Sequence, residues 1–201
     1  SSAASDVYKR QGVEASLTGH MVFSTLHTNS APESITRLLD MGMDPFNFAD
    51  ALLGILAQRL AKKLCDCKQA YTPDAEELRL FAAEYAEELR HSQAWKADYA
   101  GESQKMVAQW QKTYGDNGQL KLYKAVGCDK CNGSGYKGRV GLHELMVADD
   151  SVKKLIQERA RVAELFSAAV EGGMRTLKMD GMEKVMMGLT DLKMVRQVCI
   201  K

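Results

Sequence analysis

The stretch SLTGHMVFSTLHTNS, residues 16–30, holds a short apolar run between two histidines. The run is rich in β-branched and aromatic residues, and a Thr-Gly turn precedes it. A short apolar run bounded by turn residues is typical of a strand buried on both faces, as in the parallel sheets of α/β proteins. We therefore predict a buried strand over residues 20–27 and an α/β fold.

Two helices are predicted after this strand. Ser30 and Glu33 have the spacing of a capping box, so a helix begins near residue 31, and Gly42 ends it. Asp44 followed by Pro45 starts a second helix. Its apolar residues form one stripe that predicts a helix as far as residue 64, namely Leu52, Ile55, Leu56, Leu60 and Leu64.

The 60 residues from 68 to 127 separate two pairs of cysteines, and we expect them to form a peripheral arm. A helix begins after Pro73, with acidic residues in its first turn, where the helix dipole favours negative charge. The polar stretch 91–119 shows no clear period, and Trp95 and Trp110 are its predicted anchors. The apolar face of the helix consists of Leu78, Phe81, Tyr85 and Leu89.

The C-terminal third combines a strand with helices. Residues 139–145, RVGLHEL, alternate in polarity like a strand. Residues 151–171 are predicted to form a helix or a pair of turns. The chain ends with a methionine-rich helical segment, 182–187, and with a helix that Thr190 caps and that extends to Val198.

Composition excludes several classes of protein. With 45% hydrophobic and 26% charged residues among 201, the chain can bury a core of ordinary size in one or two small domains. The net charge of +1 argues against nucleic-acid binding through a strongly basic surface. No apolar run reaches the roughly 18 residues of a membrane span, so we expect a cytoplasmic protein. Residues 1–11 have no apolar period, and we interpret them as a non-native leader.

Four of the five cysteines form two pairs along the chain. Cys128 and Cys131 have the C-x-x-C spacing that brings two thiolates from one turn to a tetrahedral ion. Cys65 and Cys67 have a tighter C-x-C spacing, which leaves open whether both bind. We predict a four-cysteine zinc site, and the alternative is four reduced thiols that hold no metal.

The predicted zinc ion is structural. Gly133 and Gly135 are expected to let the backbone turn past the ion at positive φ. The ion would hold the two ends of the arm together, which replaces a core that the arm cannot form alone. Nothing nearby offers the three ligands and open position of a catalytic zinc.

The two histidines of the opening stretch are predicted to have separate roles. Side chains seven residues apart on a strand point to opposite faces, so His20 and His27 do not share a metal ion. His27 lies at the carboxyl end of the predicted strand, where α/β sheets bind their ligands. It either contacts a phosphate there or forms a hydrogen bond within its own loop.

Several separate stretches follow one another in an order that resembles the ATPases of type II secretion and type IV pilus assembly. They are SLTGHMVFSTLHTNSAPESITRLLDMG, ALLGILAQRLAKKLC, GCDKCNGSGYKGRVGLHEL, GMRTLKMDGMEKV and GLTDLKMVRQV. The resemblance covers residues 12–201 apart from most of the arm. It implies the C-terminal part of a RecA-like P-loop NTPase domain with a tetracysteine zinc subdomain and a C-terminal helical region. The implied segments are 12–64 for the ATPase domain, 65–138 for the zinc-binding arm with its insertion, and 139–201 for a strand and the helical subdomain.

The resemblance also implies roles for individual residues. His27, and less directly His20, belong to the histidine box that senses the terminal phosphate of ATP, and Thr28 beside them would bind the nucleotide. Gln58 and Arg59 are placed on a helix that borders the nucleotide. The implied cofactors are ATP, Mg²⁺ and Zn²⁺, with Cys65, Cys67, Cys128 and Cys131 as zinc ligands.

The resemblance implies a homo-hexameric motor on the cytoplasmic face of the bacterial inner membrane. There it would act with the platform protein of the secretion or pilus machinery, without nucleic acid. A phosphate-binding loop needs G-x-x-x-x-G-K-[ST], and no such run occurs in the 201 residues. The acidic motif that holds Mg²⁺ is expected just before Gly12, where the leader begins. We therefore expect no ATP hydrolysis by this fragment, and we expect its intact parent to be an ATPase.

Two alternatives remain. CDKCNGSGY also resembles the repeat of the zinc-binding region in J-domain co-chaperones, but that region needs several copies and one occurs here. A zinc-ribbon nucleic-acid binder is disfavoured by the balanced charge. Among related motors, those that retract pili lack the tetracysteine arm, so the cysteines favour a secretion or assembly motor.

Overall fold

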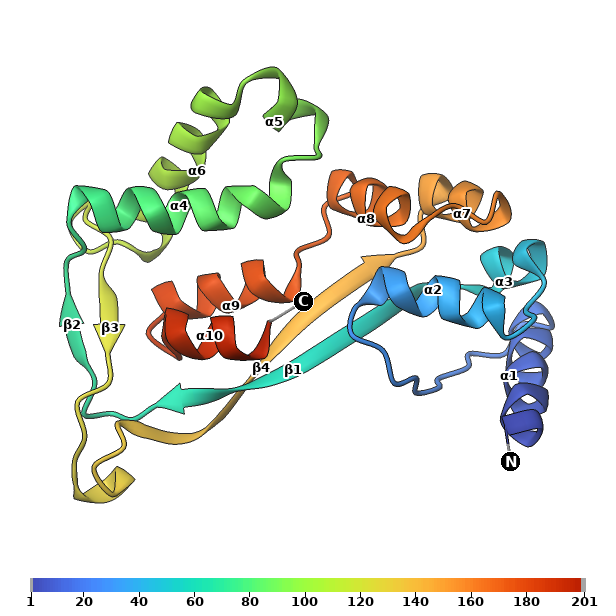
Figure 1. Cartoon of the computed structure of the whole chain (residues 1–201), viewed down its shortest axis with the longest axis horizontal. Helices are drawn as coiled ribbons and strands as arrows, with labels where there is room; N and C mark the ends of the chain where they lie inside the picture. Colours follow the sequence, from blue (N-terminus) through green and yellow to red (C-terminus); the bar gives the residue numbers. More distant parts are fainter. Residues whose placement is uncertain (1, 200–201) are drawn as a thin grey trace. The chain divides into compact units, whose positions relative to one another are not determined.

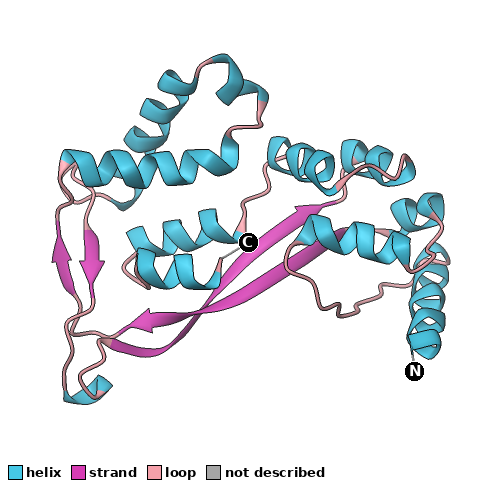
Figure 2. Cartoon of the chain, viewed as in Figure 1, coloured by secondary structure: helices cyan, strands magenta, loops and turns pink. Residues whose placement is uncertain are grey.

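The computed structural model describes residues 2–199 as a mixture of helices and strands (Figure 1, Figure 2). The chain divides into two compact units. The first unit contains the chain up to residue 57 together with residues 144–174, and the second contains residues 58–143 and the chain from residue 175 onward. Two long strands, β1 (Gly54–Leu64) and β4 (Tyr136–Val147), contribute residues to both units. The mixed helix and strand content that we predicted is confirmed.

The first unit is mainly helical. Its helices are α1 (Ser2–Leu17), α2 (Ala31–Asp40), α3 (Pro45–Ala51), α7 (Asp150–Gln157) and α8 (Val162–Glu171). Its buried side chains include Ile35, Leu39, Phe48, Val152, Ile156 and Leu165. The segment 151–171, predicted as a helix or a pair of turns, is therefore two helices. Helix α1 includes much of the segment that we interpreted as a leader, and the origin of that segment stays a prediction.

The predicted start of α2 is confirmed. The Ser30 hydroxyl accepts a hydrogen bond from the backbone N–H of Glu33 (3.4 Å). The Glu33 carboxylate reaches back to the backbone N–H of Asn29 (3.1 Å), one residue before the cap. The helix ends at Asp40, and Gly42 follows with a φ of 84°. A capping pattern therefore located this helix from sequence alone.

The predicted buried strand over residues 20–27 is wrong. Residues 20–28 form neither helix nor strand, and Met21 and Phe23 are 68% and 91% exposed. A strand exists only where a neighbouring strand pairs with its backbone. Among the described residues, β1 pairs with β4 and β2 with β3, so this segment has no such neighbour.

The predicted helix from residue 45 to 64 is correct only at its start. Helix α3 begins at Pro45, with Asp44 as its cap, and ends at Ala51, after which β1 begins. Leucines at 56, 60 and 64 are four residues apart, a spacing that keeps side chains on one face of a strand as well as of a helix. Pairing with β4 decides for the strand. The two strands are antiparallel, since Ala148 donates to Leu53 at one end and Cys65 to Gly135 at the other.

The second unit contains a small antiparallel sheet and five helices among its described residues. Strand β2 (Gln69–Tyr71) pairs with β3 (Leu122–Lys124), with Ala70 opposite Tyr123. The helices are α4 (Ala75–Leu89), α5 (Gln93–Ala97), α6 (Tyr99–Tyr114), α9 (Leu177–Met186) and α10 (Leu192–Val198). The methionine-rich segment is therefore helical, as predicted.

Aromatic side chains hold the arm to the rest of the second unit. Trp110 on α6 is 5% exposed, and its ring meets those of Phe81 and Tyr85 edge to face at 5.7 and 5.0 Å. Trp95 on α5 is 8% exposed. The same core includes methionines of α9, among them Met182, which is fully buried. Both tryptophans are therefore buried, as expected of anchors, and Trp110 belongs to the core that the arm shares with α9.

The last helix has a different cap from the predicted one. The Asp191 carboxylate, not the Thr190 hydroxyl, accepts from the N–H of Met194 (2.9 Å) at the start of α10. Thr190 is fully buried, and its hydroxyl donates to the carbonyl of Lys62 on β1 (2.8 Å). Thr190 therefore forms a long-range hydrogen bond to β1 and does not cap the helix.

Within the described part of the chain, no helix has both the length and the apolar character needed to cross a bilayer.

Candidate metal centre

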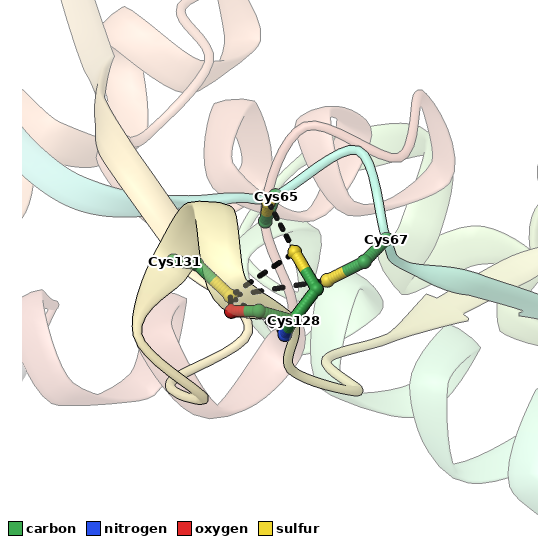
Figure 3. Close-up of side chains that lie close together, drawn as sticks. All are labelled: Cys65, Cys67, Cys128 and Cys131. Carbon is green, nitrogen blue, oxygen red and sulfur yellow. Dashed lines mark hydrogen bonds between the residues drawn. The ribbon is translucent and has the colours of Figure 1, made fainter.

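The two cysteine pairs lie at opposite ends of the arm in sequence and meet in space (Figure 3). Cys65 directly follows β1, and Cys67 lies two residues before β2. Cys128 and Cys131 belong to a single 3₁₀ turn, Asp129–Cys131, and the residue before it. The strand ladder continues into the centre, because the Cys65 N–H donates to the carbonyl of Gly135 (2.9 Å).

The four sulfur atoms have the spacing of a tetrahedral site. Sγ–Sγ distances are 3.9 Å for Cys65 and Cys128, 3.9 Å for Cys67 and Cys131, and 3.8 Å for Cys128 and Cys131. All four atoms lie within 4.8 Å of one another. A tetrahedral ion with metal–sulfur bonds of about 2.3 Å separates its sulfurs by about 3.8 Å. These distances are also too long for disulfides. The donor set therefore fits zinc, and the tight C-x-C spacing does not keep either thiol away.

Two thiols of the centre have pKa values that are shifted in opposite directions. Burial by itself raises the pKa of Cys131, but the N–H groups of Cys128 and Gly135, each 3.2 Å from its sulfur, lower the pKa to about 6. A backbone hydrogen bond from Gly127 lowers the pKa of Cys67, but burial and the neighbouring thiols outweigh it and raise the pKa to about 11. Because metal ions bind thiolates, binding of an ion here would release protons.

The glycines after the second pair adopt the positive φ that we predicted. Gly133 and Gly135 have φ values of 74° and 77°. A Cβ at Gly135 would lie 2.6 Å from the Cβ of Ala125, whereas a Cβ at Gly133 would meet nothing within 4 Å. The turn thus depends on both the φ and the small size of Gly135, but only on the φ of Gly133.

We expect Gly135→Ala to destabilise the protein more than Gly133→Ala. The Gly135 variant combines left-handed strain with a steric clash and should lose about 2–4 kcal/mol of unfolding free energy. The Gly133 variant is the matched control and should lose about 1–2 kcal/mol, from strain alone. Urea unfolding of the two purified variants measures this. Equal losses would show that the contact with Ala125 does not matter.

The residues that we predicted to contact the nucleotide do not all belong to the same unit. His20 is exposed, with Nδ1 3.2 Å from the carbonyl of Ala15. His27 is exposed, and Thr28 is half-buried, with its hydroxyl 2.5 Å from that of Ser34. These residues belong to the first unit.

Gln58 and Arg59 belong to the second unit. They lie on strand β1, so their predicted placement on a helix is wrong, for the reason given for β1. Their contact with a nucleotide stays a prediction, as do the contacts of His20, His27 and Thr28.

Sequence reasoning missed the backbone donors of the metal centre. The N–H of Gly135 contacts the sulfur of Cys131, and a backbone hydrogen bond links Gly127 to Cys67. The only signal in the sequence is a glycine on each side of the C-x-x-C pair. That signal predicts a turn but not which sulfur each N–H faces.

Comparison with known proteins identifies the family. A family model described as "Type II/IV secretion system protein" matches residues 10–197. The chain is 39% identical over 187 residues to the type II secretion system ATPase E of Vibrio cholerae, covering 92% of this chain and 31% of that protein. It is 39% identical over 183 residues to the type IV pilus assembly ATPase PilB of Thermus thermophilus, covering 90% of this chain and 17% of that protein.

A third relative is the type II secretion system protein E of Dickeya dadantii, 40% identical over 188 residues that cover 92% of this chain and 31% of that protein. The chain therefore spans a third or less of the length of these relatives. The family model covers nearly the whole chain. On this match, the chain belongs to the type II/IV secretion system protein family.

Proposed function

We propose that this chain is part of an ATPase that powers type II protein secretion or type IV pilus assembly. The match of residues 10–197 to the family is the observation that carries this proposal. The names of the relatives are in line with it, because they describe ATPases of both machineries. Residues 12–64 would then be the C-terminal portion of a RecA-like P-loop domain.

The four cysteines would hold one structural zinc ion in this ATPase. Four sulfurs at about the separation that a tetrahedral zinc requires support the assignment. Four thiolates also leave no open position for a substrate or water, so the ion would stabilise the fold and take no part in hydrolysis. It would join the end of β1 to the turn at Cys128, across an arm of 60 residues.

The nucleotide would be ATP with Mg²⁺. His27 would contact the terminal phosphate, with His20 and Thr28 nearby, and Gln58 and Arg59 would border the site. The exposure of His20 and His27 leaves both imidazoles accessible to a ligand. The whole protein would assemble as a homo-hexamer and dock on the inner-membrane platform protein of its machinery, on the cytoplasmic side.

ATP hydrolysis distinguishes this chain from a longer protein that contains it. We expect no phosphate release above background from the 201-residue chain, because phosphoryl transfer needs a lysine loop and no G-x-x-x-x-G-K-[ST] run occurs in this sequence. A protein extended by the preceding gene sequence should hydrolyse ATP. Colorimetric phosphate release with Mg²⁺ measures both.

The natural upstream sequence should contain G-x-x-x-x-G-K-[ST], and a lysine-to-alanine change in that loop is the negative control. Hydrolysis by the 201-residue chain alone would contradict the expectation for the fragment. An extended protein that binds no ATP and hydrolyses none would contradict the proposed function itself.

A further inference from the structure

A buried glutamate from a distant part of the chain meets the start of helix α2. Glu144 lies on β4, in the first unit, and is 4% exposed. One of its carboxyl oxygens accepts a hydrogen bond from the backbone N–H of Ala31, at 2.8 Å and across 113 residues of sequence. Ala31 is the first residue of α2 and is fully buried. The contact therefore joins the helix start to the strand inside the unit.

Glu144 completes the hydrogen bonding of the first residues of α2. The first N–H groups of a helix have no acceptor within the helix. The N–H of Glu33 is bound by Ser30, and Pro32 has no N–H. The N–H of Ala31 is bound by Glu144. Because Ala31 is fully buried, loss of this acceptor would leave a buried donor without a partner.

The same helix holds the segment that carries His27. A guanidinium nitrogen of Arg37 on α2 donates to the backbone carbonyl of His27 (2.5 Å). The hydroxyls of Thr28 and Ser34 lie 2.5 Å apart, and Ser34 is also on α2. Figure 1 shows the segment as a long loop that leads directly into α2. The place of His27 and Thr28 thus depends on where α2 begins.

We propose that Glu144 is a positioning residue for His27 and Thr28. It fixes the start of α2 to β4, and α2 in turn holds the histidine segment through Arg37 and Ser34. This inference rests on the proposed function, in which His27 contacts the terminal phosphate. A group that must meet a phosphate gains from being held in place before the nucleotide arrives, because a small displacement lowers the rate steeply.

Hydrogen exchange on the 201-residue chain tests the positioning without any assumption about function. Glu144→Met removes the acceptor oxygens at similar length, and Glu144→Gln keeps one of them. We expect amides of residues 27–35 to exchange about tenfold or more faster in the Met variant and within about threefold of the wild type in the Gln variant. If the Glu144→Met variant does not fold, Glu144→Asp replaces it in the experiment. The aspartate side chain is one methylene shorter, so its carboxyl group should not reach the N–H of Ala31.

The matched control is Glu158→Gln, an exposed glutamate of the same unit near Lys154. It should leave exchange unchanged. Unchanged exchange of residues 27–35 in the Met or Asp variant would overturn the inference.

Kinetics of the extended protein then test the link to His27. Glu144→Met and His27→Ala should each lower kcat by roughly 10-fold to 100-fold, with a smaller change in the KM for ATP. The double variant should be no slower than His27→Ala, because Glu144 is proposed to affect the rate through the position of His27. Glu144→Gln should restore most of the rate.

Losses that multiply in the double variant would overturn the inference, since a merely destabilised fold affects the rate independently of His27. If His27→Ala hydrolyses ATP like the wild type, the proposed role of His27 fails. In that case the exchange experiment still decides whether Glu144 holds the segment, so the two failures are distinguishable.

Discussion

Replacing Cys131 by serine should abolish zinc binding and unfold the turn that carries Cys128. The sulfur of Cys131 lies 3.8 Å from that of Cys128 and 3.9 Å from that of Cys67, so its loss removes one corner of the site. Structural zinc sites contribute about 10–16 kcal/mol in small metal-dependent domains. The arm also shares a hydrophobic core with α9, so we expect a smaller loss here, about 3–5 kcal/mol of unfolding free energy.

Elemental analysis and thermal unfolding measure these two effects. The wild type should carry about one zinc per chain, and the Cys131→Ser variant should carry none and unfold at a lower temperature. A strong chelator should shift the wild type toward the variant and leave the variant unchanged. Cys199→Ser is the matched control, because Cys199 lies outside the cluster. Full zinc content in the Cys131 variant, or a metal-free wild type of unchanged stability, would contradict the assignment.

Replacing Trp110 by alanine should cost about 3–5 kcal/mol of unfolding free energy. Its indole is almost fully buried and meets the rings of Phe81 and Tyr85 edge to face. The change would leave a large cavity between α4 and α6, which no neighbouring side chain can fill without moving. It should also lower the stability of the arm more than that of the first unit.

Urea unfolding, followed by circular dichroism, measures this loss. Leu80→Ala is the control, because Leu80 lies on α4 but is 53% exposed, so its removal should change stability by less than about 0.5 kcal/mol. Hydrogen exchange by segment shows where the loss falls. A Trp110 variant that unfolds at the same urea concentration as the Leu80 variant would show that the aromatic cluster does not hold the arm.

Local patterns located most of the helices correctly. Ser30 and Asp44 cap the helices that they were expected to cap, because a cap is a contact between residues two or three apart. The apolar face of α4 was correct for a similar reason, since its period depends only on the helix itself. The C-x-x-C pair likewise forms within a single turn.

Elements that depend on distant partners were the ones predicted wrongly. β1 was expected to be helical, because its leucines fit both periods and only β4 decides between them. Residues 20–27 were expected to be a strand, but no strand of the described chain pairs with them. Thr190 was expected to cap a helix, but it donates to the carbonyl of Lys62 instead.

The sequence by itself determined the starts of α2, α3 and α4, the two cysteine pairs and the family, because each depends on residues close together or on ordered motifs. Only the tertiary structure decided that all four sulfurs meet at the separation of a tetrahedral site. Only it showed that Glu144 on β4 binds the first N–H of α2. Both results need residues more than 60 positions apart to come together. Chain folding places such residues, and local spacing carries no information about that placement.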